Sequence, residues 1–307
     1  MRWKVALVTA RAARGLDEDM PPLLAACAGA GVAAEITDWD DAAVDWSRFD
    51  AVLLRSAWDY AERRGEFLAW AQRVAAQSAL FNPLPVVRWN SDKHYLHELA
   101  QAALPVVPTS YAETAAEASR TLGDFLARHP PDELVVKPAI GAGARSTRRH
   151  DRHATAEILG HMHSILESGR SVMLQPYLED VDVRGESALM FIDGRFSHAV
   201  RKGPLLPRGA QATAGLFAPE EIVARTADAA ELAVAERVLA WLPFDRLLYA
   251  RVDLVRDGEG TPRLLELEIT EPSMFLAHPP GAAERFVAAL LARLGQPGLR
   301  TDRPRLK

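Results

Sequence analysis

Four charged residues near the C-terminus have types and spacing suited to work on phosphate groups. They lie in two segments, Y-A-R-V-D-L-V at 249–255 and L-L-E-L-E-I-T-E-P at 264–272. Side chains alternate between the faces of a strand, so Arg251 shares a face with Asp253, and Glu266 with Glu268. A hairpin turn near Glu259 would put Asp253 opposite Glu266 and Arg251 opposite Glu268, with all four on one face. The same register sends four aliphatic residues into the core: Val252, Leu254, Leu265 and Leu267.

Three carboxylates on one face of a sheet repel one another. At ~4 Å and an effective dielectric constant near 20, each pair of like charges costs about 4 kcal/mol, and one arginine cannot offset all of it. A divalent cation can, and oxygen ligands with open positions for phosphate oxygens are typical of a Mg²⁺ site. We therefore predict Asp253, Glu266 and Glu268 as metal ligands. The alternative is a solvated charged face with one ion pair.

Lysine is rare in this chain, and three interior lysines are candidates for phosphate contacts. Of the 36 basic residues only five are lysines, and Lys93, Lys137 and Lys202 are the interior ones. The lysine ammonium is a compact point charge, whereas the arginine guanidinium is planar and forked. A lysine in a chain that otherwise uses arginine therefore suggests a specific contact. The alternative is that these lysines persist by chance at the surface.

A small-residue loop, G-A-G-A-R-S-T at 141–147, follows Lys137. It is not a P-loop, because no Gly-Lys-Ser/Thr follows at the required spacing, and Ser146 occupies the third glycine position of a dinucleotide fingerprint. Its backbone N–H groups, one arginine and two hydroxyls could still fold over phosphates. By itself the segment also fits an ordinary loop.

Hydrophobic periodicity gives the elements that must position these residues. The first part of the chain predicts a parallel sheet, with strands at 3–9 and 49–55, helices at 21–29 and 66–76, and a linker at 81–85. The middle part predicts helices from Ser91 or Asp92 to 103, at 115–128 and at 154–167, and strands at 106–109, 133–140 and 171–178. The last part predicts a hairpin over 186–201 with an Asp193-Gly194 turn, a helix at 219–242, the hairpin of 248–256 and 263–270, and a helix at 282–294.

Composition excludes several classes of function. The chain has 307 residues, a net charge of −5 and one cysteine, Cys27. One cysteine excludes a disulfide framework and fits a reducing cytosol, so we expect a cytoplasmic protein. Basic runs are too short for a dedicated nucleic-acid binder, and no apolar stretch reaches 18 residues. We expect neither nucleic acid nor a membrane as a partner.

The order of these motifs resembles the ATP-grasp superfamily of carboxylate–amine ligases. The resemblance begins near Trp89 and follows Lys93, Lys137 with its loop, a hinge at Gln175-Pro176-Tyr177-Leu178, and the final hairpin. Four further segments are similar to one branch, the O-ureido-serine cyclo-ligases. They are R-S-A-W-D-Y at 55–60, V-V-R-W-N-S-D-K at 86–93, F-S-H-A-V-R-K at 196–202 and E-L-E-I-T-E-P-S at 266–273.

The resemblance implies an α/β fold of three lobes, at 1–88, 89–174 and 175–307, with ATP between the central and C-terminal lobes. ATP and Mg²⁺ are the implied cofactors, and Asp253 and Glu266 match the family's metal ligands. The family often has asparagine where this chain has Glu268. In the family an acidic residue near the hinge binds the ribose. Glu179, Asp180 and Asp182 are the candidates here, and the sequence does not distinguish among them. The other implied nucleotide contacts are Lys93, Lys137, Gly141, Gly143, Ala144, Arg145, Ser146, Gln175, Pro176, Tyr177 and Leu178.

The implied reaction transfers phosphate from ATP to a carboxylate of a small amino-acid-like substrate, and a nitrogen nucleophile then attacks the acyl phosphate. Arg201, Lys202 and Arg251 are the expected catalytic residues. The expected substrate contacts are Arg55, Trp58, Asp59, Tyr60, His198 and Ser273. We expect the nucleophile to belong to the same molecule, so that a ring closes, as in antibiotic biosynthesis of the cycloserine type. Alternatives are an intermolecular amide ligase, a small-molecule kinase and a non-catalytic nucleotide-binding module. Homodimers are common in the family.

Overall fold

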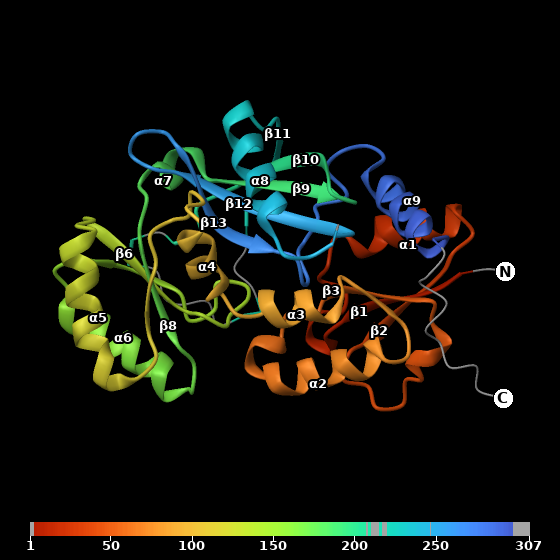
Figure 1. The fold of residues 1–307 in the computed structure, drawn as a ribbon, viewed down its shortest axis with the longest axis horizontal. Helices are drawn as coiled ribbons and strands as arrows, with labels where there is room; N and C mark the ends of the chain where they lie inside the picture. The colour runs from red at the N-terminus through yellow and green to blue at the C-terminus, as the bar shows by residue number, and fades with distance from the viewer. Residues whose placement is uncertain (1–2, 207, 210–214, 217–219, 246, 297–307) are drawn as a thin grey trace.

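The computed structural model describes residues 3–206, 208–209, 215–216, 220–245 and 247–296. They form three sheets (Figure 1), and the first is parallel in the order β2-β1-β3-β4. Its strands are β1 (Lys4–Thr9), β2 (Ala33–Asp38), β3 (Ala51–Ser56) and β4 (Ala79–Phe81), with helices α1 (Met20–Gly29) and α2 (Arg64–Ala75) and 3-10 turns at Arg11–Ala13, Trp46–Arg48 and Tyr60–Glu62. The core strands β1 and β3 are almost continuously apolar because helices cover both faces of a parallel sheet.

The linker predicted at 81–85 is wrong. Strand β4 ends at Phe81 and helix α3 (Leu84–Asn90) begins three residues later. Pro83 lies just before this helix and Pro85 in its first turn, where a missing N–H costs nothing. The helix predicted from Ser91 or Asp92 instead begins at Tyr95 as α4 (Tyr95–Gln101).

The second sheet is antiparallel in the order β5-β8-β6-β7. Its strands are β5 (Ser110–Ala112), β6 (Glu133–Pro138), β7 (Arg148–Asp151) and β8 (Val172–Pro176). Helices α5 (Ala115–Arg128) and α6 (Thr155–Glu167) lie together at the left of Figure 1 and pack on this sheet through one apolar cluster. The strand predicted at 106–109 is displaced to 110–112, and Val106 makes an isolated bridge to Leu264.

The third sheet is antiparallel in the order β11-β10-β9-β12-β13. Its strands are β9 (Glu186–Ile192), β10 (Arg195–Lys202), β11 (Ile222–Arg225), β12 (Tyr249–Arg256) and β13 (Pro262–Glu268), with helices α7 (Asp180–Arg184) and α8 (Ala229–Trp241). The helix predicted at 219–242 is therefore too long. Asp228 and Glu231 form a capping box that starts α8 at Ala229, and Pro219 lies outside the described residues.

The predicted register of the last hairpin is confirmed. Arg251 pairs with Glu268 and Asp253 with Glu266. A bulge follows, because Leu254 pairs with Leu264 and leaves Leu265 without a partner on β12. An extra residue in one strand shifts the alternation of faces. Leu265 is consequently not in the core as predicted but lines the cavity described below, beside Glu266.

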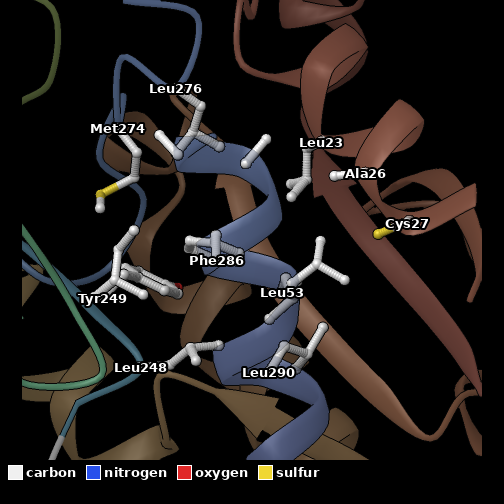
Figure 2. Packing of buried hydrophobic residues seen from close by; sticks show 14 of the residues in the cluster. Leu23, Ala26, Cys27, Leu53, Leu248, Tyr249, Met274, Leu276, Phe286 and Leu290 are labelled. Atoms are coloured by element: carbon white, nitrogen blue, oxygen red, sulfur yellow. The ribbon is translucent and has the colours of Figure 1, made fainter. Parts of the chain in front are cut away.

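Helix α9 (Ala282–Leu294) returns to the first part of the chain. Figure 2 shows α9 with Tyr249 and Met274 on one side and Leu23 and Cys27 on the other. One apolar cluster thus joins the first and third sheets through this helix. The lobe boundaries predicted at 88 and 174 stay predictions. Among the described helices, none is long and apolar enough to cross a membrane.

Candidate active site

A cavity of about 520 Å³ lies where the three sheets meet. Among the described residues, its wall contains nine carboxylates and five lysine or arginine side chains. The carboxylates are Asp17, Glu18, Asp19, Glu186, Glu220, Asp253, Glu266, Glu268 and Glu271, and the basic residues are Lys93, Lys137, Arg145, Lys202 and Arg251. So strong an excess of carboxylates suits a ligand that brings cations with it.

One end of the cavity is apolar. Val107, Val135, Val255 and Leu265 line it together with all four residues of the predicted hinge, Gln175, Pro176, Tyr177 and Leu178. The guanidinium of Arg149 stacks on the Tyr177 ring, 3.5 Å from its centroid. This end offers a flat, partly apolar slot of the kind that accepts an aromatic base.

The three candidate ribose ligands are absent from the described wall of the cavity. Glu179, Asp180 and Asp182 all lie outside it, and Asp182 accepts hydrogen bonds from Tyr177 and Arg149. Arg149 also holds Glu133, so Asp182 belongs to a charge network behind the hinge. The prediction that Asp182 contacts the nucleotide is not supported by this geometry.

The hairpin carboxylates are separated by cations. Arg251 donates through Nε and Nη2 to both oxygens of Asp253, at 2.8 and 2.9 Å, and through Nη2 to Glu268. Lys202 Nζ lies 3.2 Å from Asp253 Oδ2 and 3.1 Å from Glu186. Burial alone would raise the pKa of Asp253, but Arg251 and Lys202 together hold it below its usual range. Burial raises the pKa of Glu268 to about 7 despite Arg251.

The two remaining lysines differ in their surroundings. Lys93 Nζ lies 3.0 Å from Glu266 Oε1 and donates to the carbonyl of Gly141 at 2.6 Å. Burial would lower the pKa of Lys93, but the charge of Glu266 raises it. Lys137 lines the cavity without an ion pair within 4 Å among the described residues, and burial lowers its pKa. Lys137 is therefore a buried cation ready for an anionic ligand.

The carboxylates predicted to bind a metal are bound by basic side chains in this structure. In the part of the chain that the structure describes, no three acidic, histidine or cysteine side chains form a ready-made metal site. The reason is that Arg251 and Lys93 bind the carboxylates that would serve as ligands. The donors are hard oxygens on rigid strands, which fit Mg²⁺. A polyphosphate would give the basic side chains a new partner and leave the carboxylates for the metal.

The small-residue loop covers one side of the cavity. Gly141, Gly143, Ala144 and Arg145 line it as predicted. Ser146 does not, because its carbonyl accepts from His161 and its hydroxyl faces Arg170. Gly143, Ala144 and Ser146 all have positive φ angles, which makes the loop a conformation that side chains rarely adopt. Arg145 reaches across to Glu62 and to the carbonyl of Trp58 in the first part of the chain.

Several predicted substrate residues hold the backbone of one loop instead. We call residues 270–276, which follow β13, the 270–276 loop. Arg55 donates to the carbonyl of Pro272, Trp58 to that of Glu271 and Arg251 to that of Ser273, while His198 contacts that of Met274 at 2.8 Å. Arg55 and His198 are absent from the described cavity wall, so the structure does not support the prediction that they contact substrate. Trp58 and Ser273 do line it.

In two further pairs of neighbouring residues, one side chain faces the cavity and the other points away from it. Tyr60 lines the cavity, whereas Asp59 turns away and accepts from the Trp39 indole at 2.8 Å. Lys202 faces the cavity, and Arg201, its neighbour on β10, points to the opposite side and donates to the carbonyl of Arg184. Alternation along a strand allows only one of two consecutive residues to face the site. Arg201 and Asp59 thus lie outside the described cavity wall, which does not support the prediction of a site role for either.

Sequence reasoning missed several wall residues. The run Asp17-Glu18-Asp19 follows β1, and the end of a parallel strand is a usual place for ligand contacts. Glu271 lies in the E-L-E-I-T-E-P-S segment at 266–273, but no sequence pattern indicates that it faces the cavity. Asn90, Glu186 and Glu220 carry no local signal, because only the packing of distant strands brings them to the cavity.

Two families match consecutive parts of the chain. Residues 5–82 match "D-cycloserine synthetase DcsG, N-terminal domain", and residues 101–277 match "Prokaryotic glutathione synthetase, ATP-grasp domain". The cycloserine biosynthesis protein DcsG of Streptomyces lavendulae is 43% identical over 297 residues, 94% of this chain and 98% of that protein.

Solved structures also match this chain over almost its whole length. The crystal structure of D-cycloserine synthetase DcsG superposes with a TM-score of 0.88 at 42% identity, covering 95% of this chain and 99% of that one. A D-alanine–D-alanine ligase from Bacillus anthracis superposes with a TM-score of 0.67 at 15% identity, covering 96% and 97%. At that identity the second likeness concerns the fold alone.

Proposed function

This chain belongs to the ATP-grasp family and to the family of D-cycloserine synthetase DcsG, and from that membership we propose that it closes a ring within an amino-acid substrate. It has the α/β ATP-grasp fold and is an ATP-dependent ligase. The proposal adds the reaction: a substrate carboxylate is activated as an acyl phosphate, and a nitrogen of the same molecule attacks it, as in the conversion of O-ureido-serine to cycloserine.

One observation carries the ATP-binding part of the proposal. Three lysines and Arg251 converge on one end of the cavity, and the opposite end is apolar. The lysines are Lys93, Lys137 and Lys202. A nucleoside triphosphate has this polarity, since its base is flat and its phosphates are anionic. The lysines bind phosphate oxygens, and the 141–147 loop closes over them with backbone N–H groups.

Asp253, Glu266 and Glu268 are the residues that would hold Mg²⁺, which supplies positive charge to the phosphate oxygens when bound. On arrival of the triphosphate, Lys93 exchanges Glu266 for a phosphate oxygen, and Lys202 does the same with Asp253. Glu266 is thereby released, and each oxygen of Asp253, while still accepting from Arg251, keeps a second lone pair for the metal. The phosphate is thus surrounded by fixed positive charge, which is the main source of catalysis in phosphoryl transfer.

In the proposed reaction Arg251 stabilises charge on the transferring phosphate and on the substrate carbonyl. Its guanidinium is fixed by Asp253, Glu268 and the carbonyl of Ser273. A cation held in place before reaction stabilises the oxyanion that forms when nitrogen attacks the acyl phosphate, without further reorganisation. The proposal assigns the substrate contacts to Trp58, Tyr60 and Ser273, all of which line the cavity.

An intramolecular nucleophile fits a cavity of about 520 Å³ that must also contain ATP. One small amino acid fills the remaining space better than two, and an intramolecular attack gains an effective concentration of up to ~10⁵ M or more in well-oriented cases. A homodimer and a cytoplasmic location complete the proposal but have no part in the chemistry.

The test supplies ATP, Mg²⁺ and O-ureido-serine of either hand, and follows ADP and product mass together. A ring product formed in step with ADP is expected. ADP that appears only after a second amino acid is added identifies an intermolecular ligase. ADP with a stable phosphate ester, and no hydroxamate on addition of hydroxylamine, identifies a small-molecule kinase.

A further inference from the structure

Glu271 is a buried residue in the cavity wall whose carboxylate has no partner among the described residues. The residue is 8% exposed and lines the cavity, yet its side chain forms neither an ion pair nor a hydrogen bond with any of them. Four other wall carboxylates, two buried and two half-buried, each have a cation within 3.2 Å: Asp19 has Arg55, Asp253 has Arg251, Glu186 has Lys202 and Glu266 has Lys93. A buried carboxylate without a partner is costly unless a ligand supplies one.

The backbone that carries Glu271 is fixed on both sides. The Trp58 indole donates to the carbonyl of Glu271 at 3.2 Å. The Tyr249 hydroxyl lies 2.9 Å from the carbonyl oxygen of Thr270, and Arg55 donates to that of Pro272 at 3.0 Å. Side chains from β3, from the turn after it and from β12 thus contact three consecutive carbonyls, so the Glu271 side chain starts from a rigid position.

Glu271 lines the same cavity as the charged hairpin residues and the Trp58–Tyr60 segment. The charges of Glu268, Glu266, Lys93 and Arg251 all act on it. The Trp58 indole donates to its carbonyl, and its charge acts on the buried Tyr60 hydroxyl. Under the proposed function Glu271 is therefore near both the phosphate-binding residues and the expected substrate residues.

We propose that Glu271 is the proton acceptor for the attacking nitrogen of the substrate. The inference rests on the proposed function. In this step the nitrogen forms a bond to the acyl carbon while its N–H proton passes to the Glu271 carboxylate. The bond from the acyl carbon to the phosphate oxygen breaks, and the proton passes from Glu271 to the departing phosphate, which leaves as HPO₄²⁻. This transfer restores the Glu271 carboxylate.

The proton affinity of Glu271 suits this role. Burial, together with the charge of Glu268, raises the pKa of Glu271 to about 8, although Lys93 and Arg251 oppose the rise. A carboxylate with a raised pKa is a stronger base than an exposed glutamate, and a base whose pKa lies near the working pH is the most effective proton acceptor.

The experiment separates acyl phosphate formation from nitrogen attack in Glu271→Gln. Hydroxylamine at high concentration traps the acyl phosphate as a hydroxamate and needs no protein base, whereas ring closure without hydroxylamine requires one. We expect the variant to keep hydroxamate and ADP formation, and to lose ring closure by about 10²-fold or more, the usual contribution of general-base catalysis. Glu271→Asp should recover part of the ring closure, because it keeps a carboxylate.

Two controls make the outcome specific. Glu259→Gln removes an exposed carboxylate in the turn between β12 and β13, outside the described cavity wall, and should leave the ratio of ring closure to hydroxamate unchanged. Thermal unfolding of Glu271→Gln checks that the variant is folded. Equal loss of both reactions, or no loss of ring closure, overturns the role of Glu271. If the wild-type protein forms no hydroxamate from any amino acid, the proposed function fails instead.

Discussion

Arg55 and Asp19 form a buried ion pair that holds the 270–276 loop. Arg55 Nη2 lies 2.9 Å from Asp19 Oδ2, and neither side chain is more than 3% exposed. The two oxygens of Asp19 accept the backbone N–H groups of Met274 and Leu276, at 2.5 and 2.6 Å. A pair from the first sixty residues thus sets the position of a loop more than 200 residues later, next to the hairpin of β12 and β13.

Asp19→Asn should destabilise the protein strongly. The substitution keeps the shape of the side chain but leaves the Arg55 charge buried without a counterion, which typically costs 3–5 kcal/mol. Urea unfolding measures the effect. The matched control is Glu35→Gln, which removes the carboxylate from the exposed pair with Arg48 and should cost about 1 kcal/mol or less. Equal costs for the two variants would contradict a structural role for the Arg55–Asp19 pair.

Lys137→Ala should weaken ATP binding and abolish turnover without loss of stability. Lys137 has no ion pair within 4 Å among the described residues, and burial lowers its pKa, so its charge does not stabilise the unliganded fold. ATP titration and thermal unfolding provide the two measurements. Lys4→Ala, at the exposed start of β1, is the control and should change neither. Wild-type affinity in Lys137→Ala would remove this lysine from the site.

Glu266→Gln should abolish Mg²⁺-dependent activity and also lower the stability of the unliganded protein. Repulsion among the hairpin acids alone suggests the opposite, a gain in stability. The structure reverses that sign, because Glu266 is the counterion of the buried Lys93 and its removal leaves a buried charge unpaired. Thermal unfolding without nucleotide checks the sign, and an ADP assay over a range of Mg²⁺ concentrations checks the metal dependence.

Glu268→Gln should have the opposite effect on stability, and only at higher pH. Burial raises the pKa of Glu268 in the folded protein from its ordinary value of 4.5 to about 7. The charged form therefore costs folding free energy, a cost that begins above pH 4.5 and is complete above pH 7. The glutamine variant should therefore unfold at a higher temperature than wild type at pH 8, and at a similar temperature at pH 4. A loss of stability at pH 8 would show that the hydrogen bond from Arg251 outweighs burial.

His94 should stabilise the protein at low pH only. Its Nδ1 lies 2.6 Å from Asp92 and its Nε2 2.9 Å from Glu113, and the bond to Asp92 is the main reason why the pKa of His94 rises to about 8. A raised pKa gives stability that is complete below the unfolded value of 6.5 and is lost as the pH rises through 8. His94→Gln should lower the unfolding temperature at pH 6 and have less effect at pH 9. His97→Gln, which loses only a bond to Gln101, should show no such pH dependence.

Local patterns in the sequence determined the elements and the pairing of the last hairpin. Alternation of charged and aliphatic residues around a turn fixed the partners Arg251–Glu268 and Asp253–Glu266, because any other register would bury the charges. Helices α5 and α9 have the predicted bounds, since apolar residues at helical spacing with clear ends leave little choice. The order of lysines, loop, hinge and hairpin was enough to indicate the ATP-grasp family.

Only the tertiary structure decided which side chains face the cavity and what neutralises them. Arg55 and His198 were expected at the substrate, but they hold backbone carbonyls of a loop that lies 76 to 217 residues away in the chain. Tertiary packing also determines two other features of the site. One is the bulge that turns Leu265 into the cavity, and the other is the set of cations that separate the hairpin carboxylates. Such contacts depend on how distant elements pack, and periodicity along the chain describes only the residues that are close in sequence.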